Sequence, residues 1–157
     1  MIRVGLIGYG LAGAVFPEPL IRACDGLELS AVLTSREHPL RVGSTEGLFE
    51  RSDLAVVASP NDSHFPLARA ALERGKHVVV DKPFTVAIDE ADALILLARE
   101  TERMLTVFHN RRWASDFLSV RKVLPKLGEL FLVEANWDRF RPDVRQRWRE
   151  QPGPGAG

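Results

Sequence analysis

Ile2-Arg3-Val4-Gly5-Leu6-Ile7-Gly8-Tyr9-Gly10-Leu11-Ala12-Gly13 is the stretch that decides the fold. Its apolar first half predicts a buried strand of a parallel sheet. The glycines that follow have the G-x-G-x-x-G spacing of a dinucleotide-binding turn. In such a turn Gly8 permits the sharp bend, Gly10 lets the backbone approach a pyrophosphate, and Gly13 allows a helix to pack closely on the strand. The first N–H groups of that helix would face the phosphates. The alternative is a glycine-rich turn without a ligand.

The composition limits the class of protein. The 157 residues suit one domain of common size, and the 21 basic and 21 acidic residues cancel, so bulk charge predicts no nucleic-acid partner. No apolar run reaches the length needed to span a membrane. The single cysteine, Cys24, excludes an internal disulfide, fits a reducing compartment and is expected to be buried beside the first helix. We therefore expect a cytoplasmic protein without a membrane partner and without a metal site.

The end of the second predicted strand, over residues 27–33, distinguishes between two cofactors. An NAD site usually has Asp or Glu about twenty residues past the glycines. Here that place holds Thr34-Ser35-Arg36, and hydroxyls with a guanidinium would bind a 2′-phosphate, which favours NADP over NAD. Two alternatives stay open. A shift of one residue would place Glu37 at the ribose, or Arg36 is a plain surface arginine.

The segment between this strand and the next one is short for a crossover connection. Prolines also interrupt the first helical stretch, so a turn over residues 11–16 is expected to be followed by a new helix from Pro19. Residues 34–53 must then hold a possible strand at Arg41-Val42 and a helical turn over residues 44–51. One helix of the usual pattern is therefore predicted to be missing or reduced.

Polar residues follow the next buried strand, over residues 54–58. They are Ser59-Pro60-Asn61, with His64 in the first turn of the helix that comes after them. Open α/β sheets bind ligands outside the carboxyl ends of their strands, so these residues are expected to face the same crevice as the glycine turn. His64 is expected either to contact the ligand or to be a capped surface histidine.

A buried strand over residues 77–80 delivers Asp81-Lys82-Pro83 to the same edge. Charges are costly to bury without a purpose, so their position favours function. Lys82 would donate a proton or a hydrogen bond to a carbonyl that the nicotinamide reduces, and Asp81 would hold Lys82 or contact the ribose. The alternative is a solvated salt pair. A further strand over residues 104–108 brings Asn110 to this edge, where it would bond cofactor or substrate.

The pattern predicts two parts. Residues 1–128 form an α/β domain with a Rossmann-type parallel sheet flanked by helices, and residues 129–157 begin a second part. In this second part, apolar residues alternate with others over residues 129–138. Phe131, Val133, Ala135 and Trp137 then share one face, which is typical of a half-buried antiparallel strand. One strand cannot form a sheet alone, so we expect the first strand of a missing second α+β domain.

Taken together, these motifs resemble the glucose-fructose oxidoreductase / inositol dehydrogenase / MocA family. Within it the sequence is most similar to NADP-dependent scyllo-inositol dehydrogenases and their polyol-oxidising relatives. The similarity covers almost the whole chain, and a homo-oligomer is implied for the full-length protein. The matching stretches are 8–13, Ser59-Pro60-Asn61 with His64, Gly75-Lys76-His77, Asp81-Lys82-Pro83, His109-Asn110-Arg111-Arg112-Trp113, Phe140-Arg141-Pro142 and Arg147-Trp148-Arg149-Glu150.

The resemblance implies a role for several residues. Lys82 stands for the lysine of the family's Glu-Lys-Pro motif, near nicotinamide and substrate, with a cis bond before Pro83, and Asp81 replaces the glutamate while keeping its charge. Asn110 is similar to an asparagine near the nicotinamide. Trp148-Arg149 resembles a pair that reaches back to the cofactor. The family's second motif, an aspartate and a histidine that shares proton transfer with the lysine, is expected beyond residue 157.

The sequence therefore predicts an NADP-dependent oxidoreductase that moves hydride between nicotinamide and a secondary alcohol of a cyclic polyol or sugar, such as an inositol. The alternative is a truncated nucleotide-binding domain that lacks catalysis. Lys82 is the predicted catalytic residue. The predicted cofactor-binding residues are Gly8, Tyr9, Gly10, Leu11, Ala12, Gly13, Thr34, Ser35, Arg36, Ser59, Pro60, Asn61, His64, Asp81, Lys82, Asn110, Trp148 and Arg149.

Overall fold

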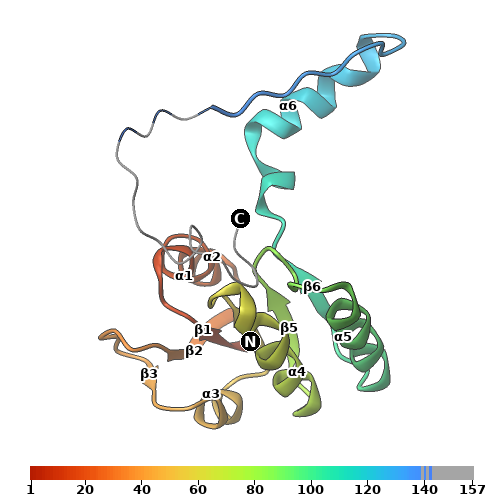
Figure 1. Ribbon diagram of the computed structural model, residues 1–157. Coiled ribbons are helices and arrows are strands. Elements are labelled where there is room, and N and C mark those ends of the chain that lie inside the picture. Colours follow the sequence, from red (N-terminus) through yellow and green to blue (C-terminus); the bar gives the residue numbers. More distant parts are fainter. Residues whose placement is uncertain (139, 141, 143–157) are drawn as a thin grey trace. The chain divides into compact units, whose positions relative to one another are not determined.

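The computed structural model describes residues 1–138, 140 and 142 (Figure 1). The chain divides into two compact units, Met1–Phe108 and His109–Gly157. The first unit holds the sheet and most of the helices. The domain boundary predicted after residue 128 stays a prediction.

The first unit is built on a six-stranded sheet with the order β3-β2-β1-β4-β5-β6, in which every neighbouring pair is parallel. The chain runs from β1 outward to β3 and then returns to the other side of β1 for β4. Open sheets bind ligands where the strand order reverses in this way, outside the carboxyl ends of the strands. This confirms the predicted Rossmann-type fold. The strands are β1 (Ile2–Ile7), β2 (Leu27–Leu33), β3 (Arg41–Val42), β4 (Leu54–Val57), β5 (His77–Val80) and β6 (Leu105–Val107).

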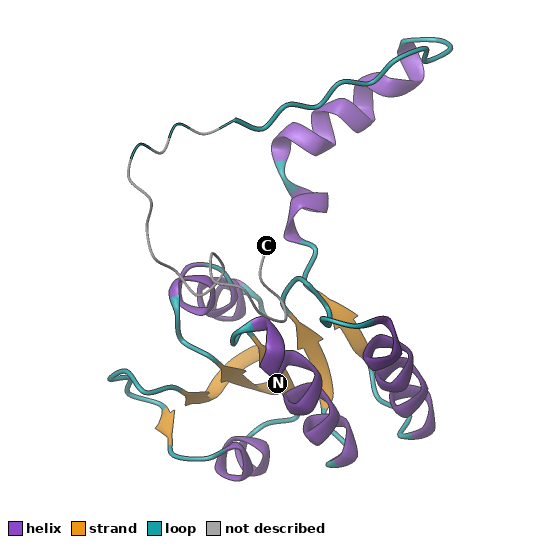
Figure 2. Ribbon diagram, in the orientation of Figure 1, coloured by secondary structure: helices purple, strands orange, loops and turns teal. Residues whose placement is uncertain are grey.

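Helices pack on both faces of this sheet (Figure 2). They are α1 (Leu11–Val15), α2 (Pro17–Ala23), α3 (Thr45–Arg51), α4 (His64–Glu73) and α5 (Ile88–Glu100), with a 3₁₀ turn η1 (Asn61–Ser63). One buried cluster joins α3, α4 and α5 to the sheet through residues such as Leu48, Leu72 and Leu94. The other cluster packs Ile21 of α2 on Val4 of β1 and its neighbours. The central strands β1 and β4 are therefore buried on both faces, as near-continuous apolar strands predict.

The short crossover between β2 and β4 forms as predicted. The two-residue strand β3 pairs with the end of β2, and the helical turn expected over residues 44–51 is α3. Ser44 caps this helix, because its hydroxyl accepts a 3.2 Å hydrogen bond from the Gly47 N–H. The helix that was predicted to be missing or reduced is thus reduced to seven residues.

The interrupted first helix differs from the prediction in one detail. The second piece begins at Pro17 rather than at Pro19. Both prolines then fall in the first turn of α2, where no intrahelical N–H bond is needed and where a proline at the first position is favoured. The prediction for Cys24 is wrong, because this residue is exposed at the end of α2.

The second unit contains three helical elements, a 3₁₀ turn η2 (Asn110–Trp113), α6 (Ser115–Val123) and a 3₁₀ turn η3 (Leu124–Lys126), in the part that is described. The strand predicted over residues 129–138 does not form. Phe131 and Trp137 of the expected buried face are instead 102% and 65% exposed. The physical reason is that a strand needs a neighbouring strand, and the six-stranded sheet of the described residues does not extend to this segment.

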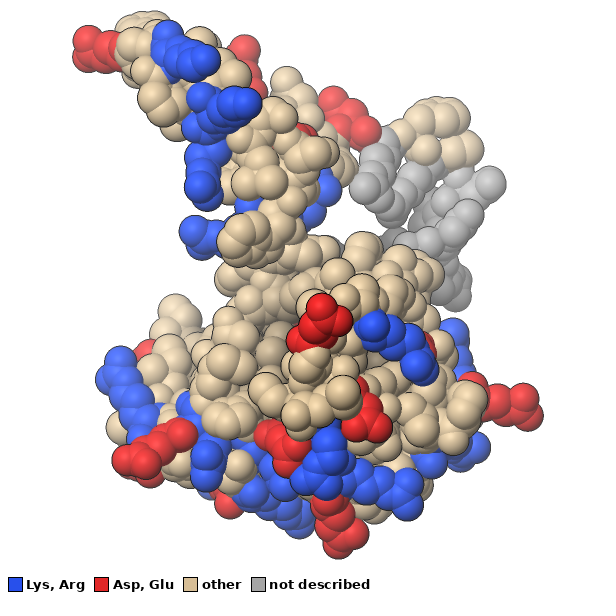
Figure 3. Space-filling model, turned by 180° about the vertical axis from the view of Figure 1, so that it is seen from behind, with Lys and Arg blue, Asp and Glu red and all other residues tan. Residues whose placement is uncertain are grey.

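Acidic and basic side chains lie side by side on the surface. Figure 3 shows both signs on the face of the molecule that it presents, as the equal totals of 21 and 21 would suggest. Within the described residues, no helix combines the length and the apolar character that crossing a bilayer demands.

Candidate functional site

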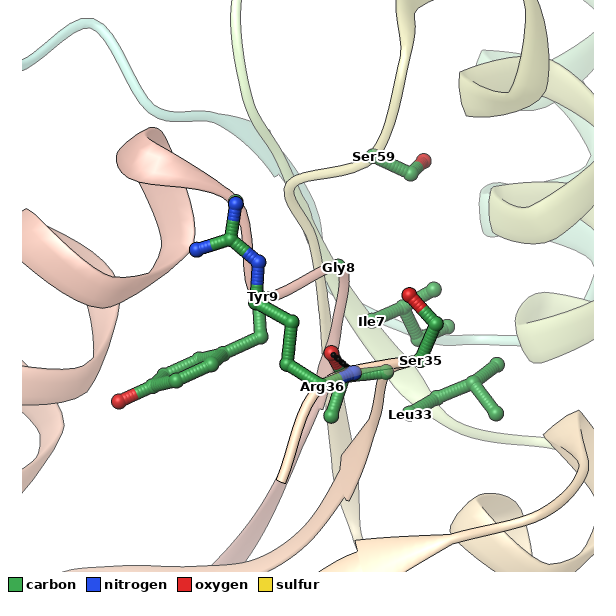
Figure 4. Close-up of a pocket in the computed structure, with 9 residues that line it drawn as sticks. Ile7, Gly8, Tyr9, Leu33, Ser35, Arg36 and Ser59 are labelled. Atoms are coloured by element: carbon green, nitrogen blue, oxygen red, sulfur yellow. Dashed lines mark hydrogen bonds between the residues drawn. The ribbon is translucent and has the colours of Figure 1, made fainter. Parts of the chain in front are cut away.

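A pocket of about 550 Å³ lies at the carboxyl ends of β1, β2 and β4. Three short segments line it, and Figure 4 shows how their side chains lie around the glycine turn. The lining residues are Ile7, Gly8, Tyr9, Gly10, Leu33, Thr34, Ser35, Arg36 and Ser59. The pocket therefore sits at the reversal of the strand order, where this class of sheet binds its ligands.

The glycine turn is fixed between the two strands that flank β1. The Gly8 N–H donates to the Leu33 carbonyl of β2 at 3.0 Å, and the Ala58 N–H beyond β4 donates to the Ile7 carbonyl at 2.8 Å. Gly8 has a φ of 95°, in the left-handed region that favours glycine. Beside Gly10, by contrast, an added Cβ would meet nothing within 4 Å. The turn thus keeps its backbone open toward the pocket at Gly10.

Close packing of the helix on the turn requires Gly13. A Cβ at this position would collide with the Gly8 carbonyl oxygen and would lie 3.2 Å from the Gly8 carbonyl carbon. It would also lie 3.9 Å from Ala58 Cβ. The packing role that the sequence predicts for Gly13 is therefore present in the structure. The helix itself, α1, has only five residues, as the short turn predicted over residues 11–16 implied, so its dipole is weak.

The wall at the end of β2 carries hydroxyl and guanidinium groups. Thr34 Oγ1 accepts a 3.0 Å hydrogen bond from the Arg36 N–H, which folds the chain back at this point. The Arg36 side chain runs from there toward the glycine turn (Figure 4). None of the nine lining residues is acidic, and Glu37 is not among them. The structure therefore gives no support to the alternative that placed a carboxylate at the ribose.

The loop after β4 contributes Ser59 to the pocket, and hydrogen bonds within the loop and η1 stabilise it. The Ser59 and Ser63 hydroxyls lie 2.6 Å apart, and Ser63 also donates to the Pro60 carbonyl at 2.6 Å. Asn61 is buried at the start of η1. Pro60 and Asn61 support this loop and do not line the pocket.

His64 is neither a pocket residue nor a surface residue. It is 1% exposed, and its two ring nitrogens face two backbone carbonyls, Pro83 at 2.8 Å from Nδ1 and Ser59 at 2.9 Å from Nε2. A neutral ring donates to one of these carbonyls, whereas a protonated ring donates to both. The expectation that His64 is a surface residue is therefore wrong, and its contact with a ligand stays a prediction. It connects the loop after β4 with the loop after β5.

The loop after β5 presents an exposed lysine. The Asp81 N–H donates to the Val57 carbonyl at 2.8 Å, and Asp81 Oδ1 accepts from the Lys82 N–H at 2.8 Å. The bond between Lys82 and Pro83 is cis, as the resemblance implied. Because the Lys82 side chain is exposed, the argument from a buried charge does not apply. Asp81 bonds the backbone of Lys82, so the alternative of a side-chain salt pair is not seen among the described residues.

The structure thus brings together seven of the predicted residues. Gly8, Tyr9, Gly10, Thr34, Ser35, Arg36 and Ser59 line one pocket. Leu11, Ala12 and Gly13 lie in α1, directly after the turn, and Asp81 and Lys82 lie at the same edge of the sheet without lining the pocket. Asn110 begins η2 in the second unit. Trp148 and Arg149 lie outside the described residues.

Two apolar lining residues were missed by the sequence argument. Ile7 and Leu33 are the last residues of β1 and β2. Their position could have identified them, because the last residue of a strand next to the place where the strand order reverses borders the crevice. Metal binding has no support in the described part of the chain, where no three His, Cys, Asp or Glu side chains gather.

Comparisons with known proteins agree with this geometry. Residues 2–109 match the GFO_IDH_MocA model, which describes an oxidoreductase family with an NAD-binding Rossmann fold. The uncharacterized oxidoreductase YdgJ of Escherichia coli is 52% identical over 168 residues, which cover 99% of this chain and 49% of that protein. The scyllo-inositol 2-dehydrogenase (NADP(+)) IolW of Bacillus subtilis is 34% identical over 168 residues, with 99% and 47% coverage.

A solved structure has the same fold. The YPO2259 protein of Yersinia pestis superposes with a TM-score of 0.89 at 48% identity, covering 95% of this chain and 46% of that one. The chain therefore spans about half the length of the curated relatives and of the solved structure that it matches.

Proposed function

The chain belongs to the glucose-fructose oxidoreductase / inositol dehydrogenase / MocA family of oxidoreductases, and on that premise we propose that it is an NADP-dependent dehydrogenase. The reaction would move hydride between nicotinamide and a secondary alcohol of a cyclic polyol or sugar, with an inositol as the model substrate. IolW, whose name states both NADP and scyllo-inositol, supports this choice.

The observation that carries the cofactor proposal is the composition of the pocket wall. A 2′-phosphate needs cationic and hydroxyl donors and is repelled by a carboxylate. The pocket offers Thr34, Ser35 and Arg36 and has no acidic lining residue among the described residues. Within the described part of the chain, Arg36 also makes no ion pair with a carboxylate of the protein. Its charge is therefore available to a phosphate.

The residues also fit the rest of a dinucleotide. The open backbone beside Gly10 leaves space for a pyrophosphate at the turn. When bound, NADP would supply the hydride acceptor of the reaction. Lys82 would donate a hydrogen bond to the reacting oxygen of the substrate or take its proton, and Asp81 would fix the backbone of Lys82. His64 would keep the loops after β4 and β5 together beneath this lysine.

The cofactor proposal is tested by fluorescence titration of the purified chain with NADPH and with NADH. We expect tighter binding of NADPH. Arg36→Gln should weaken NADPH about tenfold or more, because a charge-assisted hydrogen bond is lost, and should leave NADH nearly unchanged. Arg41→Gln is the matched control, since Arg41 is exposed, lies near the same loop and does not line the pocket. Equal or tighter binding of NADH would refute the proposal.

The substrate class needs a separate measurement. Formation of NADPH from NADP is followed with scyllo-inositol, myo-inositol and an acyclic polyol. The proposal expects turnover with a cyclic polyol, and it expects Lys82→Met to lose that turnover while NADPH still binds, because Lys82 does not line the dinucleotide pocket. Binding of NADPH without turnover of any polyol would instead support the second interpretation, a nucleotide-binding module without catalysis.

A further inference from the structure

A cluster of polar side chains lies behind the Arg36 wall of the pocket. It joins the glycine turn through Tyr9, helix α2 through Glu18 and Arg22, and the loop between β2 and β3 through His38. The Glu18 and His38 side chains are only 12% and 4% exposed, although they are polar. Buried polar groups in this number are retained where they hold segments in place.

The hydrogen bonds fix the proton positions in the cluster. His38 Nδ1 accepts from the Leu40 N–H at 3.0 Å, so this nitrogen carries no proton. The proton therefore resides on Nε2, which lies 3.4 Å from Glu18 Oε1 and donates toward it. The Tyr9 and His38 rings also pack in a T-shaped arrangement, with 4.9 Å between centroids and 69° between planes. His38 thus connects its own loop to both α2 and the glycine turn.

Glu18 is the centre of the cluster and is charged at neutral pH. Burial raises the pKa of its carboxyl group, but hydrogen bonds from Tyr9, Arg22 and His38 outweigh this effect and hold the pKa below its ordinary value. Arg22 contacts Glu18 Oε1 with Nε at 2.9 Å and with Nη2 at 2.8 Å, which offsets the negative charge. A carboxylate can therefore lie near the pocket without repelling an anion there.

The cluster adjoins the residues that would hold a 2′-phosphate. Tyr9 and Arg36 both line the pocket, and the Arg36 charge lowers the pKa of the Tyr9 hydroxyl, although the hydrogen bond to Glu18 raises it on balance. His38 lies two residues after Arg36 in the chain. His38 contacts Glu18 and its ring packs against Tyr9, so this contact restricts the loop that carries Arg36 on one side and the glycine turn on the other.

We propose that Glu18 and His38 are positioning residues for cofactor specificity. By holding Tyr9 and the loop of residues 34–38 as one rigid wall, they keep the Arg36 guanidinium directed at the phosphate of a 2′-phosphorylated adenine dinucleotide. This inference rests on the proposed function, because it assumes that the chain prefers NADPH. It adds that two residues outside the pocket, Glu18 and His38, determine how strongly the chain prefers NADPH over NADH.

The test compares the NADPH and NADH dissociation constants of variants of the purified chain. Glu18→Ala removes the acceptor of the cluster, and alanine keeps the propensity of α2. His38→Asn keeps an acceptor for the Leu40 N–H but is too short to reach Glu18, whereas His38→Gln keeps a donor near the Nε2 position. Glu73→Ala is the matched control, because it breaks the Arg69–Glu73 pair of the same spacing on α4, away from the pocket.

We expect Glu18→Ala and His38→Asn to weaken NADPH about tenfold and NADH less than about twofold, the scale of one lost hydrogen bond. His38→Gln should recover part of the preference, and Glu73→Ala should leave it unchanged. Thermal unfolding shows whether each variant is folded. If Glu18→Ala does not fold, the binding constants of His38→Asn decide the test. An equal loss for both cofactors, or no loss, overturns the inference. A wild-type chain without NADPH preference overturns the proposed function itself, which is a distinguishable result.

Discussion

Two glycines of the same turn should respond in opposite ways to the same added methyl group. At Gly10 an ideal Cβ meets no atom within 4 Å, and φ is −77°, which any residue adopts. At Gly13 the added Cβ would collide with the Gly8 carbonyl oxygen and approach its carbon to 3.2 Å. Gly10→Ala therefore tests the space left for a ligand, and Gly13→Ala tests the packing of the fold.

The expected sizes follow from these surroundings. Gly10→Ala should leave the free energy of unfolding unchanged or raise it by about 0.5 kcal/mol, because alanine reduces the freedom of the unfolded chain. It should weaken NADPH about tenfold to a hundredfold, because the methyl group displaces the pyrophosphate from backbone donors worth about 1.5–3 kcal/mol. Gly13→Ala should lower the free energy of unfolding by about 1–3 kcal/mol, the usual cost of overpacking.

Two assays distinguish these outcomes. Denaturant unfolding followed by circular dichroism gives the stability of each variant, and fluorescence titration gives the NADPH dissociation constant under native conditions. The predicted result is a stable Gly10→Ala variant that binds poorly and a destabilised Gly13→Ala variant. The reasoning is refuted if Gly10→Ala binds NADPH as tightly as the wild type, or if Gly13→Ala is as stable as the wild type.

Further predictions concern the sheet and its first crossover. The Arg3 side chain donates to Asp53 at 2.6 and 3.1 Å and holds the pKa of Asp53 well below its ordinary value of 3.8. The resulting stabilisation is complete above that value and is lost as the pH falls toward the lower folded-state pKa, so Asp53→Asn should flatten acid unfolding measured between about pH 5 and 2. Leu48→Ala, at a fully buried site, should cost about 2–5 kcal/mol in denaturant unfolding. Ser44→Ala should cost about 1 kcal/mol in the same assay, because the Gly47 N–H loses its cap.

Each of these has a contrary outcome and a control. An unchanged acid transition in Asp53→Asn would mean that the ion pair is as strong in the unfolded chain as in the folded one. A cost below about 1 kcal/mol for Leu48→Ala would mean that its surroundings collapse to fill the space. Ser44→Asp, which keeps a capping oxygen, should retain the stability that Ser44→Ala loses.

Most of the first unit could be predicted because its central strands, β1 and β4, are buried on both faces. A continuous apolar run ended by glycine or polar residues identifies such strands, and even the two-residue β3 could be placed. The start of α2 was harder, because either of two nearby prolines can occupy the first turn of a helix. The strand over residues 129–138 could not be judged from its alternation alone, since a strand also depends on a partner that the local sequence does not contain.

The candidate site was predictable to the same extent as the sheet. The glycine turn and residues 34–36 were placed together because the carboxyl ends of neighbouring parallel strands share one edge. The burial of His64 was not foreseen, because its partners are the carbonyls of Ser59 and Pro83, and every residue has a carbonyl. The Glu18–His38 contact was missed for a related reason. It joins a helix to a loop that the short crossover brings close only after folding.

The two edge strands of the sheet, β3 and β6, are too short to favour pairing with another chain. β3 contributes two residues and β6 contributes three, whereas β1 has six and β2 has seven. An exposed edge recruits another chain through its row of unpaired amide and carbonyl groups, and very short edges offer few of them. This architecture therefore discourages fibrillar, strand-to-strand growth at the two edges of the sheet.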